Sequence, residues 1–249
     1  MILADPRNPL AIEAARELEA RLPDGLPDPA LRVVLGGDGF LLHTIQNHGF
    51  EHVYLGLNAG HVGFLLNDVT DWTEAAHRIR RGAWTESAFP LIEGEAITEA
   101  GDKVHLEAIN DVYFERASGQ TARLRVDVDG TTVVDSLVAD GLIVATALGS
   151  SAYSFSAGGA ACHPTLRILC LTAICPHQPK LAPIVLPADS RVHVAVQQHQ
   201  KRPVRAVADG VEVAHVTDVR VRTSARAVRI AHLEGHDHTE RLIRKIVMP

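Results

Sequence analysis

Aromatic residues and lysines are scarce in this chain of 249 residues. Phe, Trp and Tyr make up 4% of the sequence, and arginines far outnumber the four lysines, at positions 103, 180, 201 and 245. The net charge is −6. Nucleic-acid-binding domains carry an excess of Lys and Arg, and many stack bases on aromatic rings. The composition therefore argues against a nucleic acid as the partner.

Long hydrophobic runs and an N-terminal signal are also missing. The longest apolar runs, 142–148 and 168–175, have the length of strands and fall short of the ~18 residues that span a bilayer. Residues 1–6 lack the basic and apolar regions of a signal peptide. The three cysteines lie among apolar neighbours, as buried reduced thiols do. We therefore expect a cytoplasmic protein that does not bind membranes.

The N-terminal part alternates between two patterns. Apolar residues recur at helical spacing over residues 9–22, after Asn8, a suitable N-cap. Short apolar stretches at 31–35 and 53–57 are typical of buried strands. Further helices are expected over residues 40–48 and 71–81, the second with Asp71 as its cap. Strands that alternate with helices predict a parallel sheet.

After about residue 90 the apolar residues alternate with period two. The pairs Asp129-Gly130 and Asp209-Gly210 each separate two alternating runs, which is a strong hairpin signal. Residues 218–222 and 227–231 also alternate. The sequence therefore predicts an α/β plus all-β fold, with a Rossmann-like α/β domain over 1–88 and an antiparallel, β-sandwich-like domain over 89–233.

The first chemical motif is Gly36-Gly37-Asp38-Gly39, between a predicted strand and a predicted helix. Glycines permit unusual backbone angles and close approach of a ligand, and a helix N-terminus favours phosphate. Asp38 would repel phosphate, so it fits better as a proton acceptor or beside a metal ion. The chain has neither a Walker A motif nor G-x-G-x-x-G, so the two commonest phosphate loops are excluded.

Three further motifs follow. Residues 55–65 form a second glycine-rich loop, in which Asn58 can bind a hydroxyl or phosphate and His61 either lies near a phosphate or packs in the loop. Asn110 and Asp111 together can bind vicinal hydroxyls such as those of a ribose. Residues 140–159 run from an apolar strand into a bend rich in glycine and hydroxyl groups, where a ligand can lie against the backbone.

These motifs, in this order, resemble those of the NAD kinase family. The similarity spans roughly residues 31–215. It implies an active site in the cleft between the two domains, and a C-terminal tail, about residues 234–249, that returns to the first. The implied reaction transfers the terminal phosphoryl group of ATP or polyphosphate to the 2′-hydroxyl of the adenosine ribose of NAD, giving NADP. The implied cofactor is a divalent ion, Mg²⁺, and the implied assembly is a homodimer or homotetramer.

The resemblance also implies residue roles. Asp38 is then the catalytic residue, which accepts the proton of the 2′-hydroxyl. Its usual pKa of ~3.9 makes it a weak base, which phosphoryl transfer tolerates because it relies mainly on positioning. The donor phosphates are expected at Gly36, Gly37, Gly39 and Asn58. The dinucleotide is expected at Asn110, Asp111, Asp140, Thr146, Ser151, Ala152, Tyr153, Ser156 and Asp209. No residue is assigned as a metal ligand.

The sequence departs from the family pattern at several positions. Ala147 and Leu148 stand where the family usually has Pro and Thr or Ser, and Asp111 stands where it usually has Glu. These changes leave open a different preference between NAD and NADH, or a catalytically weak NAD(P)-binding homologue. A lipid or sugar kinase with the same glycine–aspartate loop is another alternative, although the Asn110-Asp111 pair favours a dinucleotide.

His232, His236 and His238 lie close together near the C-terminus. Three histidines at short spacing can bind a metal ion. Their neighbours Glu234, Gly235 and Thr239 are polar or flexible. We therefore expect a solvated turn here rather than a metal site.

Overall fold

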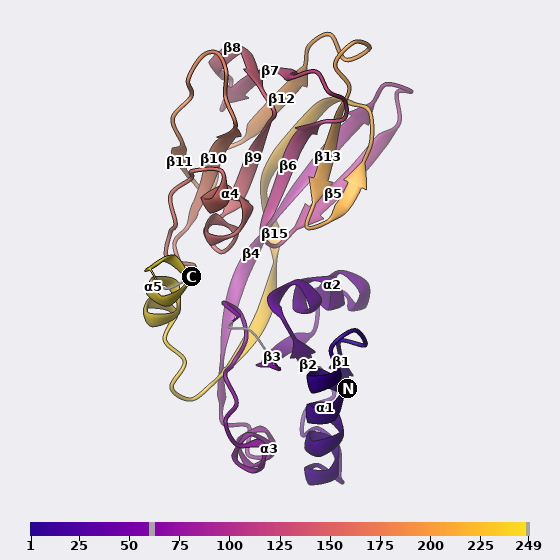
Figure 1. Cartoon of the computed structure of the whole chain (residues 1–249), viewed down its shortest axis with the longest axis vertical. Helices are drawn as coiled ribbons and strands as arrows, with labels where there is room; N and C mark the ends of the chain where they lie inside the picture. Colours follow the sequence, from indigo (N-terminus) through magenta and orange to yellow (C-terminus); the bar gives the residue numbers. More distant parts are fainter. Residues whose placement is uncertain (60–62, 248–249) are drawn as a thin grey trace. The chain divides into compact units, whose positions relative to one another are not determined.

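The computed structural model describes residues 1–59 and 63–247 (Figure 1). The chain divides into two compact units. Unit 1 comprises Met1–Phe89 and Arg226–Lys245, and unit 2 comprises Pro90–Ala225 with the residues from Ile246 onward. The first division falls one residue after the expected one at 88. The chain returns to unit 1 at Arg226, within the segment that the sequence assigned to the second domain.

Unit 1 is built on parallel strands, as the alternating pattern predicts. The strands β1 (Ile2–Ala4), β2 (Leu31–Gly36) and β3 (Val53–Asn58) pair in parallel, and the second half of β15 (Val216–Leu233) lies parallel to β3. The helices are α1 (Pro9–Arg21), α2 (Asp38–His48), α3 (Trp72–Arg80) and α5 (His238–Val247).

Side-chain caps fix where two of these helices begin. The Asn8 side-chain oxygen accepts hydrogen bonds from the N–H groups of Leu10 and Ala11, at 3.0 and 3.4 Å. Asp71 caps α3 in the same way through the N–H groups of Thr73 and Glu74. Each cap satisfies N–H groups that have no partner within the helix. Both predicted caps are confirmed.

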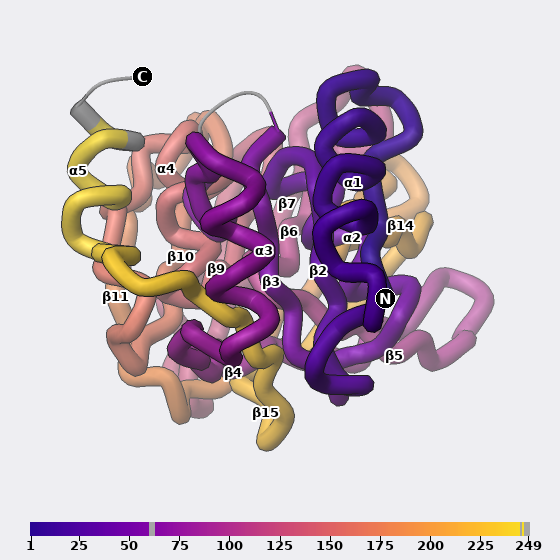
Figure 2. Tube along the Cα trace, turned by 90° about the horizontal axis from the view of Figure 1, so that it is seen from below, coloured from indigo at the N-terminus to yellow at the C-terminus, as the bar shows by residue number. Residues whose placement is uncertain are grey.

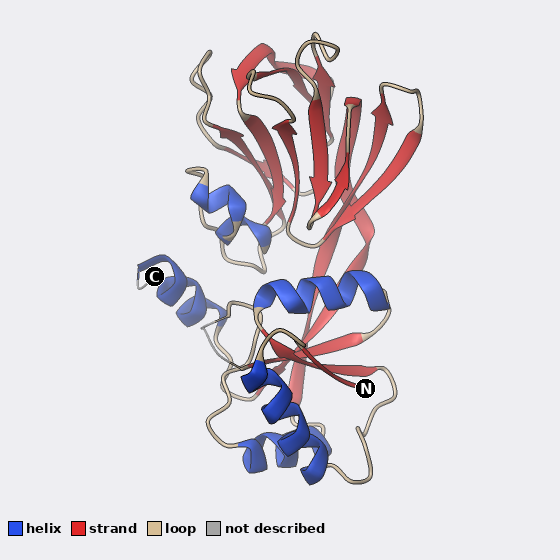
Figure 3. Ribbon diagram, turned by 45° about the vertical axis from the view of Figure 1, so that its right-hand side comes forward, coloured by secondary structure: helices blue, strands red, loops and turns tan. Residues whose placement is uncertain are grey.

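The helices of unit 1 cover both faces of the sheet (Figures 2 and 3). Leu18 of α1 and Ile79 of α3 share one apolar cluster with alternate residues of β2 and β3. On the other face, Leu41 of α2 lies over Gly56 of β3, where a Cβ would come within 3.1 Å of its side chain. Because successive residues of a strand point to opposite faces, both faces of this parallel sheet are buried.

Unit 2 consists almost entirely of antiparallel strands (Figure 3). One sheet pairs the first half of β15 with β12 (Val192–Val196), followed by β7 (Ala122–Val128) and β8 (Thr131–Ala139); β4 (Trp84–Thr98) pairs with β15 and with β5 (Lys103–Ala108). The other sheet has the order β11 (Ile184–Pro187), β10 (Ile168–Ile174), β9 (Gly141–Thr146), β6 (Asp111–Arg116), β13 (Val204–Ala208) and β14 (Val211–Val213).

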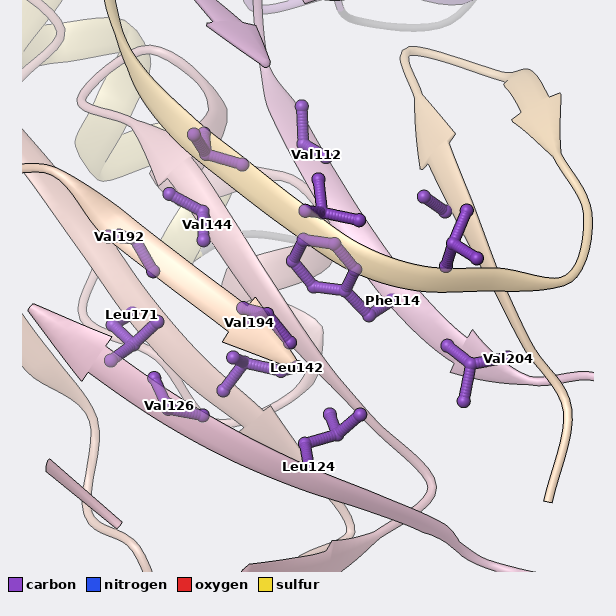
Figure 4. Packing of buried hydrophobic residues seen from close by; sticks show 14 of the residues in the cluster. Val112, Phe114, Leu124, Val126, Leu142, Val144, Leu171, Val192, Val194 and Val204 are labelled. Atoms are coloured by element: carbon purple, nitrogen blue, oxygen red, sulfur yellow. The ribbon is translucent and has the colours of Figure 1, made fainter. Parts of the chain in front are cut away.

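The two sheets of unit 2 enclose a shared core. Figure 4 shows Phe114 and Leu142 from one sheet pointing toward Val126 and Val194 from the other. Both predicted Asp-Gly turns are confirmed, since positive φ angles of 50° and 80° at Asp129 and Gly130 recur at Asp209 and Gly210 as 43° and 91°. Two consecutive positive φ angles are those of a type I′ hairpin turn. The expected α/β plus sandwich-like all-β class is confirmed.

Irregular segments join these strands. A short 3₁₀ helix, η1 (Gly149–Ser151), and α4 (Tyr153–Ser156) follow β9.

Among the described residues, no helix is both long and apolar enough to cross a membrane. The cysteines are only partly as expected, because Cys170 is buried and Cys162 half-buried, but Cys175 is exposed.

Candidate functional site

The ends of β2 and β3 carry the first group of predicted site residues. Gly36 pairs with Asn58 in the parallel register, so both glycine-rich loops leave the same, C-terminal, edge of the sheet. Open α/β sheets bind ligands at this edge. Helix α2 begins at Asp38, two residues before the expected start, and its N-cap residue Gly37 has no side chain that could cap it. Within the described residues its first N–H groups have no side-chain cap, which leaves them for solvent or an anion.

Asp38 is held in place by the backbone of the second loop. Its two carboxylate oxygens accept hydrogen bonds from the N–H groups of Phe64 and Leu65, at 2.7 and 2.9 Å. Each oxygen has a second lone pair that can accept a further bond. The two contacts fix the direction of the carboxylate without occupying all of its acceptor sites.

The glycines around Asp38 matter because they have no side chain and leave room, and not because they adopt unusual backbone angles. The expectation of such angles is wrong for Gly36, Gly37 and Gly39, because none has a positive φ. A Cβ at Gly63 would lie 2.8 Å from an Asp38 carboxylate oxygen, so a side chain there would displace it. A Cβ at Gly37 or Gly39 would meet no described atom within 4 Å, so open space borders the loop.

The Asn58 side chain already has a hydrogen-bond partner within unit 1. Its side-chain amide donates to Asp68 at 3.1 Å, and Asp68 also pairs with Arg241 at 3.0 Å. This contact orients the amide, and the expected role of Asn58 toward phosphate stays a prediction. His61 lies outside the described residues.

In unit 2, Asp209 organises the Asn110-Asp111 motif. Its carboxylate accepts hydrogen bonds from the N–H groups of Ile109, Asn110 and Asp111, at distances from 2.5 to 3.3 Å. Asp209 reaches them from the hairpin turn between β13 and β14. Its visible role is therefore to hold the motif, while its expected contact with the dinucleotide stays a prediction.

Asp111 is a buried carboxyl group, with 6% of its surface exposed. Burial, and second to it the negative charge of Asp209, raises the pKa of Asp111 to about 7. The group therefore changes charge near neutral pH. A carboxyl group in this state can donate as well as accept a hydrogen bond.

Thr146 joins the motif to the bend after β9. Its hydroxyl donates to the Ile109 carbonyl at 2.8 Å and accepts from the Gly149 N–H at 3.0 Å, and its own N–H donates to the Asn110 carbonyl at 2.8 Å. A Cβ at Gly149 would lie 2.1 Å from the Asn110 carbonyl oxygen. Two motifs far apart in the sequence thus form one compact arrangement, which only glycine at position 149 permits.

The remaining predicted residues fall into two groups. Ser151 is buried, Ala152 and Tyr153 are half-buried, and Ser156 is exposed, all in the segment that follows the bend. The Tyr153 ring meets the Tyr113 ring edge to face, 5.1 Å between centroids. Asp140 instead lies before the other end of β9 and pairs with Arg116 at 2.6 Å, so the structure does not bring it to Thr146.

Three features of the site could not be predicted from the sequence. The N–H groups of Phe64 and Leu65 hold Asp38, whereas the sequence drew attention to the glycines, Asn58 and His61 of the second loop. Gly63 belongs to that loop, and its proximity to Asp38 needs the tertiary structure. Asn67 is 3% exposed and bridges Gly56 and Ala231 through its amide. No local pattern marks it.

The C-terminal half of the chain matches a described domain family. Residues 109–233 match the ATP-NAD kinase C-terminal domain. A NAD kinase of Rhizobium meliloti is 41% identical over 239 residues, covering 94% of this chain and 91% of the relative. A NAD kinase of Xanthomonas campestris is 35% identical, covering 96% and 94%.

Two solved structures share the fold. Yeast NADH kinase complexed with NADH matches with a TM-score of 0.85 and 22% identity, over 99% of this chain and 86% of that one. A NAD kinase from Archaeoglobus fulgidus in complex with ATP matches with a TM-score of 0.78 and 23% identity, over 99% and 97%.

Proposed function

The chain belongs to the NAD kinase family, and on that basis we propose that it phosphorylates the 2′-hydroxyl of the adenosine ribose of NAD to give NADP. The phosphoryl donor is ATP or polyphosphate. The observation that carries the proposal is the fixed Asp38 carboxylate, which two backbone N–H groups orient at the uncapped N-terminus of α2.

Asp38 is proposed to accept the hydroxyl proton as the new bond to phosphorus forms. An aspartate is a weak base, but phosphoryl transfer passes through a loose transition state in which most catalysis comes from positioning and charge neutralisation. The Phe64 and Leu65 N–H groups supply that positioning, because they fix the carboxylate without occupying all of its lone pairs.

The donor phosphates are proposed to lie against Gly36, Gly37 and Gly39. Three observations support this. Among the described residues, no side chain caps the first turn of α2 and none fills the space beside Gly37 and Gly39, and the helix dipole favours an anion there. A role for Asn58 beside the phosphates is compatible with its position at the end of β3, next to Gly36.

Unit 2 is proposed to bind the dinucleotide. Asn110 and Asp111 provide polar groups for the ribose or adenine, and Asp209 and Thr146 hold them in position. Ser151, Ala152, Tyr153 and Ser156 are proposed to line the rest of the site. Ala147 and Leu148, which replace polar or rigid residues of the family pattern, are 4% and 3% exposed, so their side chains pack inward.

A divalent ion, Mg²⁺, is proposed to accompany ATP. Mg²⁺ usually keeps several waters and takes one or two protein carboxylates together with substrate phosphates. Asp38 fits this need, because its carboxylate has more lone pairs than the Phe64 and Leu65 N–H groups use and stands beside the proposed phosphate site. When bound, the ion neutralises charge on the phosphates.

The experiment that tests this function compares the wild-type chain with Asp38→Asn. We expect NADP to form from NAD, ATP and Mg²⁺, as detected with an NADP-specific dehydrogenase, and activity to fall at least 100-fold, on the order expected for loss of an acid–base group, in the variant. The exposed Asp24→Asn is the matched control. Dinucleotide binding without product would point to a non-catalytic homologue, and no dinucleotide binding would point to another kinase class.

The assembly and the location of the protein also stay proposals. We propose a homodimer or homotetramer in the cytoplasm. The apolar, strand-rich composition of unit 2 is compatible with self-association, and multi-angle light scattering on the purified chain measures the number of subunits. A monomeric mass at micromolar concentration would contradict the proposed assembly.

A further inference from the structure

Three histidines converge where β15 ends and α5 begins. His232 is the second-last residue of β15, His236 is in the connecting turn, and His238 is the first residue of α5. One ring nitrogen from each lies within 4.8 Å of the others. The expected solvated turn is wrong for His232, which is 2% exposed.

Three ring nitrogens of this cluster have no hydrogen-bond partner in the part of the chain that the structure describes. They are both ring nitrogens of His232 and Nδ1 of His236, and all three atoms are buried. Leaving buried polar atoms unpaired is unfavourable, so such groups in native proteins usually have a partner. The rings of His236 and His238 both pack against His232, at centroid distances of 3.9 and 4.8 Å.

We propose that His232, His236 and His238 together bind one divalent transition-metal ion of the zinc class. Neutral imidazole is a preferred ligand of such ions. In a tetrahedral site with Zn–N bonds near 2.0 Å, two ligand nitrogens lie about 3.3 Å apart. Nε2 of His236 and Nδ1 of His238 are already 3.2 Å apart. The ligand nitrogens of the three histidines lie within 4.8 Å of one another, so the His232 ring completes the site if its nitrogen moves by on the order of 1 Å.

The surroundings of His238 favour the ring orientation that a ligand needs. Its Nε2 lies 3.4 Å from the Ser87 hydroxyl, which leaves Nδ1 directed toward His236. Metal-binding histidines commonly use their second ring nitrogen in this way, which fixes both tautomer and direction. The Phe89 ring meets His232 and His238 edge to face and forms an apolar wall beside them.

The neighbouring charges do not block a cation. Arg241 is the positive group that faces the rings, but it pairs with Asp68 at 3.0 Å and donates a second N–H to the Gly63 carbonyl at 2.9 Å. Asp237 carries a negative charge within the turn and caps α5 through the Thr239 and Glu240 N–H groups. The cation on Arg241 is thus compensated locally.

The cluster also borders a cavity through which an ion and a fourth ligand can enter. The cavity has a volume of about 250 Å³ and is lined by His236, Asp237 and Arg241 among others. Three protein ligands and one water would complete four-coordination. Because the ligands come from β15, the turn and α5, the ion would tie the C-terminal helix to the end of the sheet in unit 1.

Metal binding can be measured on the full-length chain without a histidine tag. After chelator treatment, we expect one equivalent of Co²⁺ to give the visible spectrum of a tetrahedral site, and one Zn²⁺ per chain to displace it. His236→Gln and His238→Gln should each weaken binding by on the order of 100-fold or more, since even outer-shell partners matter 10- to 100-fold. These two variants avoid the buried ring of His232, so folding should be preserved.

Two controls separate this site from other donors. His163→Gln, at a half-buried histidine outside the cluster, leaves the cluster intact, and Cys162→Ser removes a thiol whose sulfur lies 3.8 Å from that of Cys170. Both should bind Co²⁺ as the wild type does, and Zn²⁺ should raise the melting temperature of both but not of His236→Gln. Absence of binding, a thiolate charge-transfer band, or unchanged binding by His236→Gln and His238→Gln would each overturn the proposal. The result does not depend on kinase activity.

Discussion

Asp111 is a carboxyl group that is held where its ionisation is unfavourable. In the unfolded chain its pKa is near 3.8, whereas burial and the nearby Asp209 raise it to about 7 in the folded protein. Between these two values the unfolded state releases the proton and the folded state keeps it. The group therefore lowers stability progressively as pH rises from about 4 to about 7, and the loss is complete above pH 7.

Asp111→Asn should remove this pH dependence. We expect the variant to gain stability over the wild type as pH rises from about 5 to about 7, by about 3 kcal/mol, the equivalent of two pKa units, and to gain no more above that pH. Urea unfolding at several pH values measures the difference, with the exposed Asp102→Asn as control. A stability difference that stays constant across this range would show that Asp111 ionises normally.

Gly149→Ala tests the contact between the Asn110-Asp111 motif and the bend after β9. Because the new Cβ would fall 2.1 Å from the Asn110 carbonyl oxygen, either the bend after β9 or the Asn110-Asp111 motif has to move. We expect a loss of at least about 2 kcal/mol in the free energy of unfolding, and weaker NAD binding by calorimetry. Gly119→Ala, where a Cβ meets no atom within 4 Å, is the matched control and should change neither.

The sequence could identify site residues more readily than their roles. Asp38 stands out because glycines flank it, and Asn110 stands out because a carboxyl group, that of Asp111, is next to it in the sequence. The role of Asp209 as the partner of three N–H groups could not be predicted, because those groups lie about a hundred positions earlier in the chain. Local patterns record which chemical groups are present, but contacts of this range depend on how the strands pair.

Among the elements, the loop that precedes α2 gives a direct test of phosphate binding. Gly37 has ordinary extended backbone angles, and a Cβ there would meet only open space. Gly37→Ala should therefore lower the free energy of unfolding by no more than about 1 kcal/mol, the usual cost of replacing a favourable N-cap residue by alanine.

If donor phosphates occupy that space, Gly37→Ala should raise the KM for ATP at least about tenfold through steric contact, with little change in the KM for NAD. Steady-state kinetics with each substrate varied in turn measures both constants. Gly63→Ala offers the contrast, because its Cβ would collide with Asp38, so kcat should fall instead. An unchanged KM for ATP in Gly37→Ala would show that the donor phosphates do not lie against this loop.

The elements that the sequence predicted are those with strong local signals. Asn8, Asp71 and the two Asp-Gly turns mark helix starts and hairpins through the backbone conformations that they favour. Two long strands were not recognised as such. The alternation in β15 is interrupted at Thr223–Ala225, so 218–222 and 227–231 were expected as separate strands, and β4 contains Pro90 and Gly94, residues that weaken a strand pattern.

On the scale of the whole chain, unit 1 is discontinuous. The strand β3 pairs in parallel with residues Arg229 and Ile230 of β15, and Ala231 and Leu233 belong to the same apolar cluster as α1 and α3. The buried Asn67 adds hydrogen bonds to the Ala231 carbonyl and from the Leu233 N–H. The N-terminal unit therefore depends on residues that come after the strands of unit 2 in the sequence.

A chain that ends at Ala225 should consequently keep unit 2 folded but lose unit 1. The retained part of β15 still pairs with β12, through Val219 and Val194 for example, whereas β3 loses its neighbour and exposes buried leucines. We expect hydrogen exchange to remain slow in β9 and β10 and to become fast in β2 and β3, and NADP formation to disappear. A second truncation after Asp237 removes α5 and the residues that follow it but leaves β15 whole, so β2 and β3 should stay protected there. Protection of β2 and β3 in the shorter chain would mean that residues 1–89 fold without β15.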